Sequence, residues 1–187
     1  DLIINAPTAD KPFNRTYTVK YLGNIEGGNR VTYLNVEMPV LKELALRQLS
    51  DGPPVWFGCD VGKFMYREMG ILDSELYDYS GVLNTDFSLD KAGRLDYGES
   101  LMTHAMVFTG VNISGSGKPD RWKVENSWSE KYGNKGYFVM SDSWFDEFTY
   151  QIVVKKKYLP DNLRKALEIE PVILNPWDPM GSLALNS

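Results

Sequence analysis

The feature that most constrains the fold of this chain is a run of four apolar segments between residues 100 and 156, separated by short polar connections. In order, the segments are "SLMTHAMVFTGVNI", "RWKVENSW", "YFVMSD" and "TYQIVVKK". β-branched and aromatic residues bounded by turns such as "SGSGKPD" and "EKYGNKG" predict strands. Because parallel neighbours need crossover connections of about a dozen residues or more, turns this short predict antiparallel pairing.

The rest of the chain predicts a hairpin, two helices and one further strand. In chain order, these are the hairpin strands 16–22 and 31–36, a helix between Pro39 and Gly52, the strand 55–60, and a helix over 160–171. Residues 62–99 show no sustained period, so we expect loops with short helices there. We predict an α+β domain over residues 1–170. Because residues 171–187 contain two prolines and no period, we expect an extended C-terminal arm.

The charge and hydropathy patterns limit the classes of partner. The net charge is -5, which argues against nucleic acid, because phosphate binding requires a clustered basic face. The basic run from Lys155 to Lys157 ends a predicted strand, and we interpret it as a solvated edge. No apolar run approaches the roughly 18 residues that span a bilayer, and no signal-peptide pattern opens the chain, so no membrane partner is expected.

The cysteine and histidine contents argue for a reducing compartment and against a metal centre. Cys59 and His104 are the only residues of their types, which excludes an internal disulfide. Structural zinc sites recruit several such ligands, so none is expected, and no cofactor is predicted. The expected location is cytoplasmic. The chain begins without Met, directly in loop and strand character, and we interpret it as a piece of a longer protein.

Two polar residues, His104 and Asn126, stand within otherwise apolar predicted strands. A histidine in such a strand is often a hydrogen-bonded core residue, and a buried asparagine often ties down a turn. A catalytic imidazole needs its far nitrogen held by a fixed acceptor. An asparagine carbonyl does so without adding charge, which suits a cysteine nucleophile that works as a thiolate beside an imidazolium. Trp122 and Trp128 would shield such a hydrogen bond from water.

The segments around these residues resemble the C-terminal half of papain-type cysteine peptidases. "HAMVFTGV", "WKVENSW" and "GYFVM" follow the order of the histidine strand, the Trp-x-x-x-Asn-Ser-Trp strand and the Gly-Tyr-aromatic strand of that family. The blocks "DGPPVWFGCDVGK", "GESLMTHAM", "RWKVENSW" and "EPVILNPWDPMGSLA" resemble the bleomycin hydrolase and bacterial aminopeptidase C family over nearly the whole chain. The resemblance implies the β-rich C-terminal half of an α+β, papain-like fold, with an antiparallel, barrel-like sheet and a few helices.

The resemblance implies a cysteine aminopeptidase that removes N-terminal residues from peptides with a free N-terminus. A thiolate attacks the scissile carbonyl, and His104, as imidazolium, protonates the leaving amine and then activates water. Asn126 holds the ring, and Trp128 covers that hydrogen bond. The nucleophilic cysteine and the oxyanion-hole glutamine of the family lie upstream and match no segment here. The upstream N-terminal half is therefore an expected partner, and this chain alone is expected to be inactive.

Cys59 is not expected to be the nucleophile. It precedes His104 by 45 residues (104 minus 59), whereas papain-like enzymes separate the two by about 130–150. The segment after it also lacks the helix N-terminus that lowers the pKa of a thiol. We therefore predict that Cys59 is a structural residue of a buried strand.

The C-terminal arm carries a second implication of the resemblance, since in the family it resembles a peptide lying in the active-site cleft and ends near the position of Ala184. A terminal carboxylate there would bind the free amine of a substrate and block longer chains. The residues predicted to restrict the substrate in this way are Met180, Gly181, Ser182, Leu183 and Ala184. Residues 185–187 extend this arm, so either they are trimmed or the carboxylate stands elsewhere. The alternative for residues 171–187 is a disordered extension.

Three functions stay open. The first is the aminopeptidase described above, and the second is an oligopeptidase or endopeptidase of the same family, favoured if the longer arm cannot anchor an amine. The third is a non-catalytic fragment that binds peptides or assembles with copies of itself. The resemblance also implies a ring-like homo-oligomer, a hexamer, with active sites that face inward.

Overall fold

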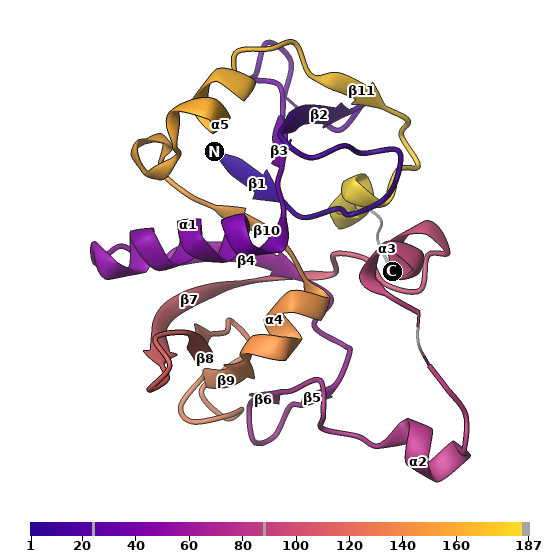
Figure 1. The fold of residues 1–187 in the computed structure, drawn as a ribbon, viewed down its shortest axis with the longest axis vertical. Helices are drawn as coiled ribbons and strands as arrows, with labels where there is room; N and C mark the ends of the chain where they lie inside the picture. The colour runs from indigo at the N-terminus through magenta and orange to yellow at the C-terminus, as the bar shows by residue number, and fades with distance from the viewer. Residues whose placement is uncertain (24, 88, 185–187) are drawn as a thin grey trace.

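The computed structural model describes residues 1–23, 25–87 and 89–184, with the side chains of 182–184 left aside. In this part of the chain, eleven strands form one sheet in the order β11-β2-β3-β1-β10-β4-β7-β8-β9-β6-β5 (Figure 1). The strands are β1 (Leu2–Ile4), β2 (Arg15–Val19), β3 (Tyr33–Asn35), β4 (Val55–Cys59), β5 (Met65–Tyr66), β6 (Ile71–Leu72), β7 (His104–Ile113), β8 (Pro119–Glu125), β9 (Tyr137–Ser141), β10 (Thr149–Val153) and β11 (Val172–Leu174).

Helices connect these strands. They are α1 (Met38–Ser50), α2 (Tyr79–Leu83), α3 (Lys91–Asp96), α4 (Asp142–Phe148), α5 (Asp161–Ala166) and the 3-10 helices η1 (Lys156–Tyr158) and η2 (Pro179–Ala184). Pro39 stands in the first turn of α1, where a missing N–H costs nothing, and Gly52 follows its last turn with φ of 101°. None of the helices in the described ranges has both the length and the apolarity needed to cross a bilayer.

The central strands carry the main core, as their apolar sequences predict. β4 pairs antiparallel with β10 on one side and with β7 on the other, which confirms residues 55–59 as a central strand. Phe57 stacks on Phe108 with ring centroids 3.8 Å apart, and Phe145 of α4 stacks on Phe108 in turn. α1 buries Leu41, Leu44 and Ala45 in the same cluster. The sheet on which β7 and β8 lie is therefore packed on a continuous aromatic core.

Several elements differ in detail from the sequence-based expectation. The strand predicted from residue 100 begins at His104, and the helix predicted over 160–171 ends at Ala166. β7, β8 and β9 form the predicted antiparallel run, but the chain then passes through α4, and β10 pairs with β1 and β4 instead of β9. Parallel pairings occur between β1 and β3, β6 and β9, and β11 and β2. Long-range pairing decides these positions, and local sequence does not report it.

The predicted extended arm is ordered by the sheet in its first half. Val172–Leu174 form β11, which pairs in parallel with Tyr17–Val19 of β2. Residues 179–184 then form η2, so the arm is not extended throughout. In Figure 1 the arm runs back past β2 toward α3, and an apolar cluster that contains both Leu95 of α3 and Met180 of η2 agrees with that view.

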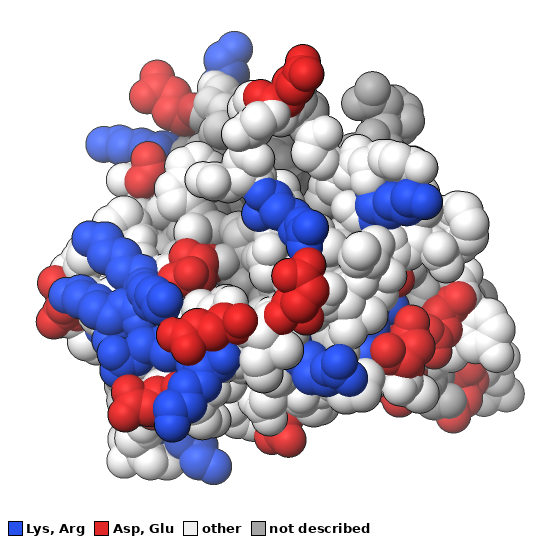
Figure 2. Space-filling view, turned by 90° about the horizontal axis from the view of Figure 1, so that it is seen from above, with Lys and Arg blue, Asp and Glu red and all other residues white. Residues whose placement is uncertain are grey.

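The basic run from Lys155 to Lys157 lies at η1 and is exposed. Lys157 pairs with Asp51 at 2.6 Å, and Tyr158 donates a hydrogen bond to the same carboxylate. Figure 2 shows basic side chains gathered at one side of the face seen from above, with acidic side chains among them. The exposure of the run and the pairing of Lys157 with Asp51 fit a solvated edge, as the sequence predicts.

Candidate active site

The register of β7 and β8 brings His104 and Asn126 to the same end of the two strands. Alternation of side chains along β7 buries Met106 and Phe108 and puts His104 on the same face, at the first residue of the strand. On β8 the buried residues are Trp122 and Val124, and Asn126 continues that face directly after the strand ends. His104 and Asn126 therefore lie at the ends of the two neighbouring sets of buried side chains on β7 and β8. The sequence predicted Asn126 on a strand, and it lies one residue beyond it.

His104 and Asn126 form a direct hydrogen bond. Nε2 of His104 lies 2.9 Å from Oδ1 of Asn126. Because an amide oxygen can only accept, Nε2 must carry the proton and donate it, which leaves Nδ1 as the basic nitrogen of the ring. His104 is half-buried, so its backbone belongs to the sheet while part of the ring stays accessible.

Trp128 lies over this hydrogen-bonded pair. Its ring centroid is 4.8 Å from that of His104, with an interplanar angle of 34°. The guanidinium of Arg67 lies over the rings of Trp128 and Tyr132, 4.8 Å from the Trp128 centroid and 4.1 Å from that of Tyr132. Arg67 was not predicted as a site residue, because it lies in the segment 62–99 that shows no regular pattern.

The backbone of the loop after β8 holds Asn126 in place. The N–H of Asn126 donates to the carbonyl of Gly136 at 3.1 Å, which closes the loop 126–136 at its base. Gly136 has φ of 86°, a conformation that favours glycine. The Asn126 side chain is 8% exposed, and its Nδ2 is buried without an acceptor among the residues that the structure describes. The amide oxygen is thus engaged, and the amide nitrogen is not.

Cys59 lies on β4 directly opposite His104 in the strand register. Its side chain is fully buried, and its thiol points to the backbone carbonyl of His104, with Sγ 3.7 Å from that oxygen. Burial, together with the charge of Asp60, raises the pKa of the Cys59 thiol well above its ordinary value. A thiol that resists ionisation and faces a carbonyl is a poor nucleophile, which agrees with the predicted structural role.

A buried polar network fixes the segment that leads into His104. Tyr150 donates from its hydroxyl to Ser100 Oγ at 2.7 Å, and Ser100 donates to the Asp60 carboxylate at 2.9 Å. All three side chains are less than 7% exposed. The N–H of Thr103 donates to the carbonyl of Cys59 at 2.9 Å. This network was not predicted from the sequence, because its members come from three separate segments.

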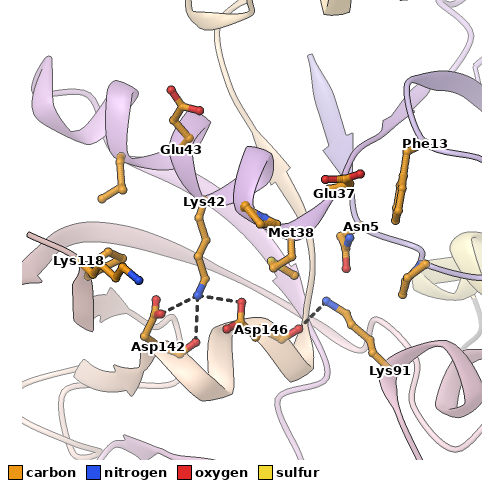
Figure 3. Close-up of a pocket in the computed structure, with 14 residues that line it drawn as sticks. Asn5, Phe13, Glu37, Met38, Lys42, Glu43, Lys91, Lys118, Asp142 and Asp146 are labelled. Carbon is orange, nitrogen blue, oxygen red and sulfur yellow. Dashed lines mark hydrogen bonds and ion pairs between the residues drawn. The ribbon is translucent and has the colours of Figure 1, made fainter.

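A cavity of about 710 Å³ lies away from these residues, between α1 and α4 (Figure 3). Lys42 reaches from α1 to the carboxylates of Asp142 and Asp146, at 2.6 and 2.8 Å. At the C-terminal end of α4, Lys91, which also lines the cavity, donates to the backbone carbonyls of Asp146 and Thr149, at 2.9 and 2.6 Å. None of the predicted site residues lines this cavity.

The residues predicted on the arm lie in η2. Met180 is 2% exposed and belongs to the apolar cluster that contains Val19, Leu95 and Met102, while a Cβ atom at Gly181 would meet Val19 at 3.1 Å. Ser182, Leu183 and Ala184 complete η2. Residues 185–187, on which the position of the terminal carboxylate depends, lie outside the described residues. Within the described ranges, no group of three or more His, Cys, Asp or Glu side chains could hold a metal ion.

Comparison with known proteins gives consistent matches. The sequence matches the Peptidase C1-like family over residues 2–181. It is 56% identical to aminopeptidase C of Lactococcus lactis subsp. cremoris over 97% of this chain, and 46% identical to bleomycin hydrolase of Gallus gallus over the same share. The crystal structure of pepW from Lactobacillus rhamnosis HN001 superposes with a TM-score of 0.96 at 57% identity, covering 98% of this chain and 42% of that one.

These matches confirm the resemblance to the aminopeptidase C and bleomycin hydrolase family and the papain-like α+β fold. The chain spans about two fifths of the length of these relatives, 42% of the Lactococcus protein and 41% of the Gallus protein, and corresponds to their C-terminal part. The match includes His104 on β7 and Asn126 directly after β8 and extends as far as Gly181 on the arm, and the chain belongs to the Peptidase C1-like family.

Proposed function

We propose that this chain is the histidine-bearing C-terminal portion of a cysteine aminopeptidase that removes N-terminal residues from peptides. The observation that carries the proposal is the hydrogen bond from Nε2 of His104 to Oδ1 of Asn126, 2.9 Å long, with Trp128 beside it. The relatives named aminopeptidase C support the substrate class. A neutral orienting amide favours a histidine that serves a thiol, since the thiolate supplies the compensating charge.

In the proposed mechanism, Nδ1 of His104 exchanges the proton. It takes the proton of the attacking thiol and returns it to the leaving amine, and in the second half it removes a proton from the water that releases the acyl group. Asn126 keeps the ring in the tautomer in which Nδ1 is free. Trp128 excludes water from the Nε2–Oδ1 hydrogen bond and so strengthens it.

The nucleophilic cysteine and the oxyanion-hole donors come, in this proposal, from an upstream half of the same protein. Cys59 cannot take the place of that nucleophile, because burial raises the pKa of its thiol well above the ordinary value. The unsatisfied Nδ2 of Asn126 supports a partner surface at this edge, because an amide N–H buried without an acceptor costs free energy. We propose further that the full-length protein is a cytoplasmic homo-oligomer, a hexamer by family resemblance.

The C-terminal arm is proposed to restrict the substrate to peptides with a free amine. Residues 180–184 would bring the end of the chain to the cleft, where a carboxylate favours an ammonium group. An enzyme without this restriction would act as an oligopeptidase or endopeptidase instead. Relative rates on aminoacyl and N-blocked reporters separate the two activities.

The test is His104→Ala in the full-length protein, assayed with an aminoacyl reporter substrate. General acid–base catalysis contributes about 10²–10⁴-fold, so kcat/KM should fall by at least 10²-fold. Cys59→Ala is the matched control, because it alters the directly paired residue on β4 and should leave kcat/KM within a few-fold of wild type. Near wild-type turnover by His104→Ala would reject the base. Absence of turnover in the wild-type full-length protein, with peptide binding retained, would favour a non-catalytic peptide-binding protein.

A further inference from the structure

A buried ion pair joins the C-terminal arm to the opposite end of the chain. Nζ of Lys11 lies 2.9 Å from Oδ2 of Asp178, and the two side chains are 4% and 10% exposed. Lys11 also contacts the Asp10 carboxylate at 2.9 Å, and Asp10 accepts a hydrogen bond from Thr8. Lys11 therefore sits between two carboxylates, one from its own loop and one from the arm.

Lys11 is itself held rigidly. The side chain of Asn35 on β3, which is fully buried, donates to the backbone carbonyls of Lys11 and Ala6, and its amide oxygen accepts from the N–H of Ala6. Burial alone would lower the pKa of Lys11, but the hydrogen bonds and charges of Asp10 and Asp178 outweigh it and raise that pKa above the ordinary value. Lys11 is thus a cation at neutral pH, and Asn35 ties its backbone to β3.

Asp178 connects Lys11 to the backbone of the arm. While Oδ2 pairs with Lys11, Oδ1 accepts a hydrogen bond from the N–H of Met180 at 2.9 Å, and the backbone carbonyl of Asp178 accepts from the N–H of Gly181. One residue therefore holds both the ion pair and the first turn of η2. Met180 packs in the same cluster as Met102, which lies two residues before His104 and against Gly58.

From this connected set of contacts we infer that Lys11 and Asp178 are the positioning pair that aims the C-terminal arm at the active site and so sets the preference for a free N-terminus. The inference rests on the proposed function of the arm. Removing Lys11 leaves the Asp178 carboxylate buried without its cation, which is strongly unfavourable. The turn that Asp178 organises would leave its place, and the backbone of η2 would no longer be held where it is.

The experiment compares Lys11→Met and Asp178→Asn with wild type in the full-length enzyme. The readout is the ratio of kcat/KM for an aminoacyl reporter to kcat/KM for the same reporter with an N-acetyl group. Both variants should lower this ratio by about tenfold, the scale of one charge-assisted contact. Lys42→Met is the control. It also removes a lysine that pairs with two carboxylates, but these belong to Asp142 and Asp146 of α4 and not to the arm, so the ratio should stay unchanged.

A second measurement guards against a trivial loss of folding. Hydrogen exchange should speed up at the amides of Met180 and Gly181 in Lys11→Met, while the amides of β7 and β8 keep wild-type protection. In an enzyme truncated after Gly181, Lys11→Met should change the ratio no further. An unchanged ratio in Lys11→Met overturns the positioning role. If Lys11→Met leaves the ratio unchanged but truncation after Gly181 changes it, the arm acts without this ion pair. The proposed function is tested separately: it stands if His104→Ala abolishes turnover while Lys11→Met and Asp178→Asn keep it.

Discussion

Two parts of the molecule are held in place by different kinds of contact. One is the end of β7 that carries His104, called here the His104 edge, and the other is the C-terminal arm. β7 pairs with β4 and β8 on its two sides, so many backbone hydrogen bonds define where His104 lies. In the described part of the arm, the corresponding contacts are a three-residue strand, a buried ion pair and a buried methionine. A position set by a ladder survives most single substitutions, whereas a position set by one charge pair does not. The proposed chemistry thus rests on rigid structure, and the proposed selectivity rests on a contact that one substitution removes.

After removal of His104 itself, the largest effect at the His104 edge is expected for Asn126→Ala in the full-length enzyme, which tests whether Asn126 orients the imidazole. The ring loses its only fixed acceptor among the described residues, and a misplacement of about 1 Å costs roughly 10²-fold, so kcat/KM should fall by that factor on blocked and unblocked reporters alike. Asn126→Asp supplies the control. Its carboxylate would stabilise the imidazolium, so the alkaline limb of the pH–rate profile should move to higher pH. A pH profile that neither variant alters would contradict the orienting role.

Truncation after Gly181 tests the arm in the opposite sense. The variant should keep its rate on aminoacyl reporters within a few-fold, because His104 and Asn126 are untouched. Its preference for a free amine over an N-acetyl group should fall by roughly tenfold to a hundredfold, the value of one charge-assisted hydrogen bond. Steady-state kinetics on matched substrates measures this preference. A truncated enzyme with the wild-type preference would show that residues 182–187 do not restrict the substrate.

The smallest expected effect, and the sharpest contrast, concerns two buried lysines. The pKa of Lys11 is raised, because the carboxylates of Asp10 and Asp178 outweigh its burial. The pKa of Lys91 is lowered well below its ordinary value, because burial outweighs the more distant charges of Glu147 and Asp146 and its hydrogen-bond acceptors are backbone carbonyls. Two lysines of similar burial, 4% and 8% exposed, should therefore respond to pH with opposite sign.

The signs follow from linkage between protonation and folding. The stabilising contribution of Lys11 is complete below its unfolded pKa, about 10.4, and is lost only as pH rises through the higher folded pKa. Lys91 binds fewer protons when folded than when unfolded, so its contribution grows with pH between its folded pKa and about 10.4. Between pH 7 and 10, opening energies from hydrogen exchange should thus show a constant difference between wild type and Lys11→Met near Gly181. The difference for Lys91→Met near Thr149 should rise with pH, by at most about 1.4 kcal/mol per unit. Parallel slopes at the two sites would refute this contrast.

Much of the His104 edge was predictable because it depends on local patterns. Period-two alternation along "THAMVF" and "WKVEN" is visible in the sequence, and it puts His104 and Asn126 on the faces that also carry Phe108 and Val124. The residue types then favour the proposed pair of a base and a neutral orienting partner. What the pattern could not give was the hydrogen bond itself, or that Asn126 follows the strand and uses its oxygen while its nitrogen stays unsatisfied.

Most strands and helices around the site, the family blocks and the pair His104 and Asn126 could be read from the sequence, because each depends on neighbouring residues or on spacing. Tertiary packing alone puts Cys59 opposite His104, inserts β10 between β1 and β4, and brings Lys11 to Asp178 from the other end of the chain. Such contacts are made by burial and by charges brought together across long separations. Their energy depends on the whole packed fold, and no local stretch of sequence carries a signal for it.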